Sequence, residues 1–439
     1  MRLREFGFGI LLILTSCTLA GEYTLEQILA LAEANNHNIR LAEAETRLAS
    51  AEKLAAFSRA MPRLSVDAGY NRNFQENVFF FEARDPFTGE EQRGSFKVSF
   101  RNEYRLNAVL NQTLFSFEVG QAIQAARYLS RLTEFSYEAT RQQVFTVVKK
   151  AFYRALLLQQ VAEVARESEV SARENYEKVK LWYEQGLASE FDLLQAETRW
   201  QNAIPEAMKA RRDYELAVNN LKVLVGLPME EEIVLTGNID VYPPLPDSVG
   251  FQEVLAQRPD YNALIWEKKL RQKNVSARRA GFFPSLKATL SYVYSAASDA
   301  FRLERENDNI VLGLSLSVPI FNANTIAQVH KAQVEVEKTA TRIDQAGVQI
   351  QVELQNIYLR LREARQRIEA ARQSVLTARR AYEIARAQVE NQLATQVELK
   401  ESRVALDQAQ INYYSAIFDY LVAYFDWQLA TGNVSAGGL

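Results

Sequence analysis

The chain has 439 residues, of which 48% are hydrophobic and 24% charged, and its formal net charge is −3 at pH 7. This balance argues against a dedicated nucleic-acid-binding protein, because such domains are usually clearly basic. One cysteine and two histidines, His37 and His330, exclude a disulfide framework and any zinc-ligand spacing. We therefore expect no bound metal, and no cofactor-binding motif is present.

The first twenty residues have the pattern of a secretory signal peptide. A basic start (MRLRE) precedes a short apolar run (FGFGILLIL) and a small-residue exit (TSCTLA). The apolar run is well short of the ~20 residues that a helix needs to cross a bilayer. Residues 1–20 are therefore predicted to be removed and the mature protein to leave the cytoplasm. The sequence LTSC also resembles a lipobox, in which case the signal would be residues 1–16 and Cys17 would be lipidated; both alternatives stay open.

Two stretches of the first half alternate apolar and polar residues. Residues 64–71 (LSVDAGYN) do so, and so does the run 96–110, with Lys97, Ser99, Arg101 and Arg105 on its polar face. A period of two predicts strands with one apolar and one wet face. Both a soluble antiparallel sheet and a lipid-facing barrel with a polar lumen have this pattern. Residues 74–95, between the two strands, are predicted to form a loop.

A long helix is predicted next, because no proline or glycine occurs between Gly120 and Gly186. Apolar residues recur within it by fours and threes, which is typical of a coiled-coil seam: Val144, Val148, Ala151, Ala155, Leu158, Ala162 and Ala165. The turn GLAS (186–189) should send the chain back as an antiparallel helix, which Pro205 should kink or break. Residues 226–247, rich in proline and glycine, are interpreted as a linker that ends at a helix start at Asp247–Ser248.

The second half repeats this layout. Pro284 aligns with Pro62, Phe321 with Phe115, and the turn QLAT (392–395) with GLAS at an offset of 392 − 186 = 206 residues. Alternating strands are predicted at 286–294 and 309–319, with a loop at 295–309 between them, and a seam from Ile357 to Val389. We interpret the chain as a tandem duplication, with repeats at 21–225 and 248–432 and a tail at 433–439.

Two considerations favour the membrane barrel over the soluble sheet. The polar strand faces carry full charges, which suit a water-filled lumen. Four strands are too few to close a barrel, which takes about eight, and an open edge is not tolerated in lipid. Several copies of the chain would therefore have to share one barrel. Tyr70, Tyr104, Tyr292 and Tyr294 fit an aromatic girdle at the membrane interface, although packing within the sheet is the competing interpretation.

Taken together, these features resemble the TolC family of bacterial outer-membrane efflux proteins, over residues from about Tyr23 to Gly432. The features are the duplicated layout, the prolines of RAMPRLSV and RAGFFPSL, the strand exit VPIFN and the paired turns. The resemblance implies a mainly α fold with a transmembrane β-barrel, in which four strands per chain form a trimeric 12-stranded barrel above a long periplasmic α-helical barrel. It also implies an outer-membrane location, extending into the periplasm, in a Gram-negative-type bacterium.

The resemblance further implies a function and partners. The homotrimer would be a passive export channel, in contact with outer-membrane lipid. It would serve a tripartite efflux or type I secretion system, together with a periplasmic adaptor and an inner-membrane pump of the RND, ABC or MFS type. The alternative is a periplasmic coiled-coil adaptor or scaffold without a pore. An enzyme is not expected, since the chain has no phosphate loop and no nucleophile elbow.

Candidate site residues follow from the resemblance, position by position. The tip turns that would contact the adaptor are Gly186, Leu187, Ala188 and Ser189, and Gln392, Leu393, Ala394 and Thr395; Gln392 departs from the glycine of the first turn. Glu398 and Glu401 match the acidic positions of the periplasmic aperture, and Asp192 is the first-half counterpart of Glu398. Residues three apart share a helix face, and a ring of carboxylates favours cations. Solvated helix residues, paired with Lys400 or Arg403, are the competing interpretation.

Overall fold

A computed structural model describes residues 21–75, 77–84, 87, 89, 91–391 and 393–434. The signal sequence, Cys17, Gln392 and most of the tail at 433–439 lie outside these residues. The chain divides into two compact units. Unit 1 comprises the described parts of Met1–Ala44, Phe135–Asn262 and Asp344–Leu439, and unit 2 comprises those of Glu45–Glu134 and Ala263–Ile343.

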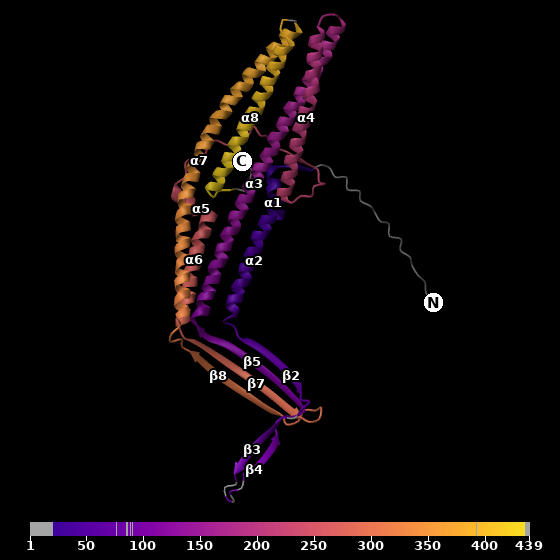
Figure 1. Ribbon diagram of the computed structural model, residues 1–439. Helices are drawn as coiled ribbons and strands as arrows, with labels where there is room; N and C mark the ends of the chain where they lie inside the picture. Colours follow the sequence, from indigo (N-terminus) through magenta and orange to yellow (C-terminus); the bar gives the residue numbers. More distant parts are fainter. Residues whose placement is uncertain are drawn as a thin grey trace, which may run out of the picture. The chain divides into compact units, whose positions relative to one another are not determined.

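Unit 2 contains an antiparallel sheet with the strand order β2-β5-β7-β8 (Figure 1). Its strands are β2 (Arg63–Arg72), β5 (Asn102–Ser116), β7 (Ser285–Ser298) and β8 (Asn307–Ser317). Pro62 and Pro284 immediately precede β2 and β7, where a residue without an N–H group costs no ladder hydrogen bond. The predicted strands at 64–71, 286–294 and 309–319 are confirmed, apart from small shifts at their ends.

The register of this sheet joins four apolar stripes into one face. Along one row, Leu64 lies opposite Leu110, Leu110 opposite Leu290, and Leu290 opposite Leu312. Because side chains alternate along each strand, the neighbouring rows place Asp67, Arg105, Lys287 and Ser315 on the opposite face. The sheet therefore has one continuous apolar face and one polar face.

The start of the predicted strand at 96–110 is wrong. Residues 74–95 contain part of a separate hairpin, β3 (Val78–Arg84) and β4 (Glu91–Lys97), and β5 begins only at Asn102. Lys97 belongs to β4, and both Lys97 Nζ and the backbone N–H of Arg101 donate to Asp299 Oδ1, at 3.1 and 3.2 Å. The alternation continues across the break between β4 and β5, so periodicity alone could not reveal it.

Aromatic packing stabilises this hairpin. The rings of Phe79 and Phe81 lie 5.4 and 6.0 Å from that of Phe96 on the same face of the ribbon. A Cβ atom at Gly94 would come within 2.6 Å of the Phe81 ring, so only glycine lets this ring lie across the facing strand. The cluster of phenylalanines in VFFFEAR was a strand signal that the interpretation of 74–95 as a loop overlooked.

Four helices have segments in both units: α2 (His37–Ser58), α3 (Phe117–Glu184), α6 (Pro259–Arg279) and α7 (Ala323–Glu390). The predicted long helices are thereby confirmed, α3 and α7 having 68 residues each. In the described part of the chain, no helix is both long enough and apolar enough to cross a membrane. A short 3-10 turn, η1 (Ala280–Phe282), leads from α6 towards β7.

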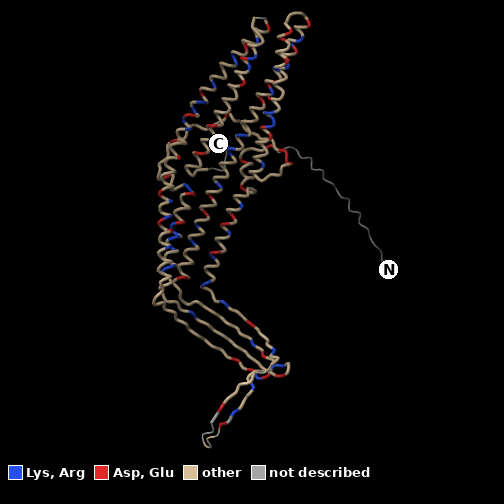
Figure 2. The backbone as a smooth tube through the Cα atoms, viewed as in Figure 1, with Lys and Arg blue, Asp and Glu red and all other residues tan. Residues whose placement is uncertain are grey.

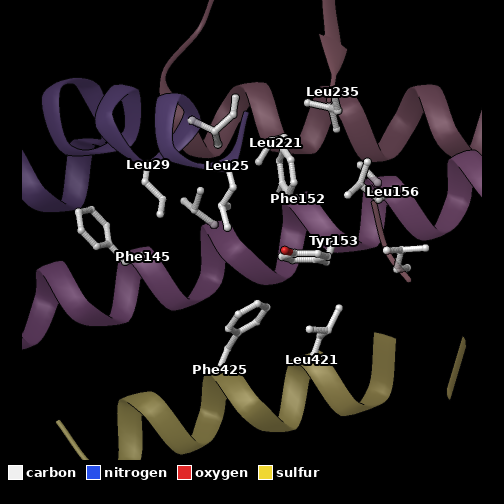
Figure 3. Packing of buried hydrophobic residues seen from close by; sticks show 14 of the residues in the cluster. Leu25, Leu29, Phe145, Phe152, Tyr153, Leu156, Leu221, Leu235, Leu421 and Phe425 are labelled. Carbon is white, nitrogen blue, oxygen red and sulfur yellow. The ribbon is translucent and has the colours of Figure 1, made fainter. Parts of the chain in front are cut away.

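Unit 1 packs the middle of α3 against α1 (Leu25–Asn35), α4 (Glu190–Val225) and α8 (Gln396–Ala430). Figure 3 shows Phe145, Phe152, Tyr153 and Leu156 of α3 among Leu25, Leu29, Leu221, Leu421 and Phe425. Val144, Val148 and Ala155 of the predicted seam are buried, as are Ile357, Leu361 and Ile368 of the second seam. The predicted seam of α3 is narrower than the face of α3 that is buried in the structure. Neighbouring helices cover more of α3 than the partner in a two-stranded coiled coil would cover.

Several details of unit 1 correct the sequence analysis. Pro205 lies inside α4 and does not end it, so the predicted break is wrong. The linker at 226–247 contains β6 (Ile233–Leu235), which pairs in parallel with β1 (Gly21–Tyr23) and contributes Leu235 to the core. The helix expected at Asp247–Ser248 starts later, as α5 (Phe251–Gln257).

Candidate functional site

The first helical hairpin of unit 1 reverses direction at Gly186. Its φ of +73° is a left-handed conformation that favours glycine. The backbone N–H of Leu187 donates to Trp182 O at 2.7 Å, and that of Gly186 to Tyr183 O at 2.9 Å. These bonds satisfy carbonyls at the end of α3 and stop the helix in the manner typical of a glycine C-cap.

The second hairpin closes with the same hydrogen bond. The N–H of Leu393 donates to Gln388 O at 2.8 Å, which repeats the five-residue spacing between Leu187 and Trp182. The Asn391 side chain adds a bond from Nδ2 to Ala387 O at 2.7 Å. The flanking residues thus form the same turn closure in both hairpins, although the sequence has glutamine at 392 and glycine at 186.

Both returning helices begin with a capping box. Ser189 Oγ accepts from the N–H of Asp192 at 3.2 Å, and Asp192 Oδ2 accepts from the N–H of Ser189 at 3.3 Å. In α8, Thr395 Oγ1 accepts from the N–H of Glu398 at 3.3 Å, and Glu398 Oε2 accepts from that of Thr395 at 2.8 Å. Two of the three predicted aperture carboxylates therefore also stabilise the start of their own helix.

We expect the stability that Ser189 gives to the first turn of α4 to be measurable. Replacing Ser189 by alanine removes one half of the box and should destabilise the first turn of α4 by about 1 kcal/mol. Hydrogen exchange of the amides at 190–193 should become faster by several-fold. Ser171→Ala, within α3, is the matched control and should leave these amides unchanged; unchanged exchange in Ser189→Ala would contradict the capping role.

Glu401, the third predicted aperture residue, lies one turn further along α8. Its side chain is exposed and makes no ion pair with the residues that the structure describes. Arg403, its predicted alternative partner, lies instead beside Asp407, with Nε 2.7 Å from Oδ1. The local structure thus leaves Glu401 available to solvent, whereas Glu398 is engaged in its cap.

Exposed apolar side chains surround both turns. Leu187 and Phe191 protrude at the first hairpin, and Leu393 and Val397 occupy the equivalent places at the second. The two leucines were predicted from the sequence, whereas Phe191 and Val397 were not, although the 206-residue offset relates them as well. Clustered apolar side chains on a protein surface favour contact with another protein.

A cavity of about 1060 Å³ lies between the two hairpins, lined by α3, α4, α7 and α8. Beside the cavity, polar contacts cross from one hairpin to the other. Ser171 Oγ lies 2.8 Å from the hydroxyl of Tyr382, Asn175 Nδ2 donates to Gln396 Oε1 at 2.8 Å, and Lys178 Nζ donates to Glu390 Oε1 at 3.0 Å. Sequence reasoning missed all three, since each pair is more than two hundred residues apart.

Acidic and basic residues are interspersed along these helices (Figure 2). Among the described residues, no three histidine, cysteine, aspartate or glutamate side chains gather closely enough to hold a metal ion. The chemistry that the site offers is therefore apolar contact at the turns and polar contact between the hairpins.

Comparison with known proteins gives a consistent result. The family model described as "Outer membrane efflux protein" matches residues 28–227 and 250–433. The alkaline protease secretion protein AprF of Pseudomonas aeruginosa is 27% identical over 255 residues, which cover 56% of this chain and 53% of AprF. The probable efflux pump outer membrane protein TtgC of Pseudomonas putida is 24% identical over 212 residues, which cover 48% of this chain and 43% of TtgC. The alignments thus span about half the length of these relatives.

A solved structure shares the fold. The Campylobacter jejuni CmeC outer membrane channel superposes with a TM-score of 0.75 at 19% sequence identity, covering 93% of this chain and 85% of that one. At this identity the likeness concerns the fold alone. The predicted TolC-like fold is confirmed at this level.

Proposed function

The chain belongs to the outer membrane efflux protein family, and from this premise we propose that it forms a passive export duct through the outer membrane. Three copies would each contribute four strands to one twelve-stranded barrel, and the helices would continue the duct into the periplasm. The single observation that carries this proposal is the register of the sheet. It joins the apolar residues of β2, β5, β7 and β8 into one face and leaves charged residues on the other.

The edges of the sheet support a shared barrel. In the described part of the chain, β2 and β8 each pair with one strand only, and the side chains of both are exposed along their whole length. An open edge is not tolerated in lipid, and four strands are too few to close on themselves. Pairing of β2 in one copy with β8 in the next would satisfy both edges in a ring of three.

The two hairpins support the tandem duplication of residues 21–225 and 248–432. Each has the same turn closure and the same capping box, and one family model matches two successive segments. In the proposed duct, the turns at 186–189 and 392–395 contact a periplasmic adaptor, through which an inner-membrane pump delivers the substrate. The exposed residues Leu187, Phe191, Leu393 and Val397 would supply the apolar part of that contact.

Only the names of the relatives bear on the class of substrate that the duct would export. AprF is named for alkaline protease secretion and TtgC for an efflux pump. Both type I secretion and tripartite efflux therefore remain within the proposal. No observation favours the alternative of a periplasmic adaptor without a pore, since an adaptor has no use for an apolar sheet face whose edge strands are exposed along their whole length.

Fractionation and conductance together test the duct. The protein should be recovered from the outer membrane as a detergent-resistant trimer, and the purified trimer should conduct ions in a planar bilayer without an energy source. A soluble periplasmic monomer, or a trimer that never conducts, would overturn the proposal.

The predicted aperture can be tested without damaging the helix caps. Glu398→Gln with Glu401→Gln removes two negative charges per chain, while glutamine can still complete the capping box. We expect the preference for cations over anions to fall several-fold, because three copies lose a ring of charge. The measurement is the reversal potential in a salt gradient.

A matched pair of substitutions controls for net charge. Glu363→Gln with Glu369→Gln changes the charge equally, at two exposed positions in the middle of α7. Ion preference should stay near the wild-type value in this variant. If both pairs change it equally, the overall charge of the duct, and not an aperture at Glu398 and Glu401, sets the selectivity.

A further inference from the structure

The cavity between the two hairpins has the composition of a small-molecule site. Its volume of about 1060 Å³ lies just above the range of roughly 300–1,000 Å³ that is typical of ligand pockets. The turn-proximal part of its wall is apolar and aromatic, with Trp182 from α3, Phe191 and Leu194 from α4, and Val397 from α8. Such a wall would make favourable contacts with the apolar part of a ligand.

Basic residues outnumber acidic ones on the cavity wall. The basic residues are Lys178, Arg199, Lys209, Arg386, Lys400 and Arg403, and the acidic ones are Glu174, Glu206 and Glu390. The difference is 6 − 3 = 3 positive charges on the wall, of which Asp407, in contact with Arg403 just outside the wall, cancels one. In a partly enclosed space, where solvent screens charge less than at an open surface, this excess attracts anions.

Two of these arginines are largely withdrawn from solvent. The side chain of Arg403 is only 13% exposed and that of Arg199 only 20%. Arg199 Nη2 donates to Ser168 Oγ at 3.2 Å, and the Arg403 guanidinium lies over the Tyr382 ring, 5.4 Å from its centroid. Both side chains are thus held in place by neighbours from other helices.

The acidic groups nearby balance the two arginines only in part. Asp407, 16% exposed, lies 2.7 Å from Arg403 Nε, but Arg403 Nη2 is buried and has no hydrogen-bond partner among the described residues. Glu206 lies 3.9 Å from Arg199, but its side chain is 64% exposed. A buried guanidinium donor without an acceptor is costly, and a bound anion close to Arg403 would offset part of this cost through its charge.

We propose that this cavity binds an amphipathic organic carboxylate. The carboxylate accepts one charge-assisted hydrogen bond from each of the guanidinium groups of Arg403 and Arg199. The body lies towards the turns, against Trp182 and Phe191. Arg199 follows Phe191 by eight residues on α4, which is roughly 12 Å at the helical rise of 1.5 Å per residue. The ligand therefore needs an apolar body about as long as two linked aromatic rings.

Biphenyl-4-carboxylate is a probe of this size, and biphenyl-4-methanol is its neutral counterpart. Binding is measured by equilibrium dialysis with the full-length protein held in amphipol, which avoids partition of the probe into detergent micelles. We expect saturable binding at one site per chain, and at least tenfold weaker binding of the alcohol. Phe191→Ala should weaken carboxylate binding several-fold.

The role of Arg403 in binding is tested by three variants. Arg403→Gln should weaken binding of the carboxylate by at least tenfold, and Arg403→Lys should recover part of the loss because it restores the charge. Since Arg403→Gln leaves Asp407 buried without a cation, the double variant Arg403→Gln with Asp407→Asn keeps the charge balanced and should lose binding equally. Arg362→Gln, an exposed arginine of α7 outside the cavity wall, is the control and should bind as the wild type does.

Three results would overturn the proposal: no saturable binding, equal binding of acid and alcohol, or unchanged binding in both Arg403→Gln variants. The site does not rest on the duct function, because binding is measured without ion flow. Trimer formation and conductance of the same preparation show separately whether the duct proposal holds.

Discussion

Replacing Leu312 by arginine should prevent assembly of the protein in the outer membrane. Leu312 lies in β8 on the apolar face of the sheet and its side chain is 71% exposed. In the proposed barrel this face meets lipid, where an arginine near the midplane costs about 2–4 kcal/mol. Three copies share one barrel, so the cost to the trimer is roughly 6–12 kcal/mol. Recovery of detergent-resistant trimer from the outer-membrane fraction should fall to near zero.

The neighbouring residue provides the control. Gly313 lies on the opposite, polar face of β8, faces Thr289, and has no heavy atom closer than 3.9 Å to the position of an added Cβ. Gly313→Arg therefore adds the same charge one residue away, on the face proposed to line the water-filled lumen. It should assemble, with altered conductance. Equal assembly of both variants, or equal failure, would contradict a lipid-facing role for the apolar side of the sheet.

Replacing Lys149 by methionine should stabilise unit 1 at neutral pH. The Lys149 side chain lies in the core of this unit, in a residue only 1% exposed, and Nζ donates to Gln428 Oε1 at 3.2 Å. The Phe425 ring lies 5.6 Å away, and no carboxylate pairs with Lys149 among the described residues. Burial lowers the pKa of Lys149 to about 8. The neighbouring Lys150, in contrast, forms an ion pair with Asp426.

The contribution of Lys149 to the free energy of unfolding depends on pH with a defined sign. The lysine pKa is 10.5 in the unfolded chain and about 8 in the folded one, so between these values the unfolded state binds more protons and stability rises with pH. Below pH 8 the full cost of the buried charge is present, about 3 kcal/mol from the size of the pKa shift. Lys149→Met should remove this cost, and its advantage over the wild type should shrink as the pH rises from 8 towards 10.5.

Chemical unfolding of the purified protein at pH 7 and pH 9.5 measures the free energy of unfolding gained by Lys149→Met and its dependence on pH. Lys150→Met is the control; it breaks an ion pair and should destabilise the protein slightly, with no comparable change between the two pH values. A Lys149→Met effect of the same size at both pH values would show that the lysine is charged throughout in the folded state.

Much of the fold could be read from local patterns. The alternation in LKATLSYVY and the absence of proline and glycine between Gly120 and Gly186 predicted β7 and α3, because side-chain period and backbone stiffness are properties of neighbouring residues. Ser189 and Thr395, each followed three residues later by an acid, are likewise a local signal for a helix start. The offset between the turns related two sites that are remote in sequence.

Other features depended on partners that the local sequence does not specify. Pro205 remains inside α4 because packing on neighbouring helices outweighs one missing hydrogen bond, a balance that propensity alone cannot give. The phenylalanines of VFFFEAR became a strand only through the facing strand at 91–97. The burial of Lys149, and the contact between Ser171 and Tyr382, bring together residues from different helices.

The sequence by itself determined the long helices, most of the four sheet strands and their amphipathic faces, the two hairpin turns and the resemblance to its family. Only the tertiary structure decided the register that joins four apolar stripes, the cavity between the hairpins, and the burial of Arg403 beside Asp407 at its wall. The physical reason is that periodicity, capping and turn chemistry act over a few residues. Cavities, buried charges and polar links between helices depend on which distant side chains meet, and these contacts leave no periodic signal in the chain.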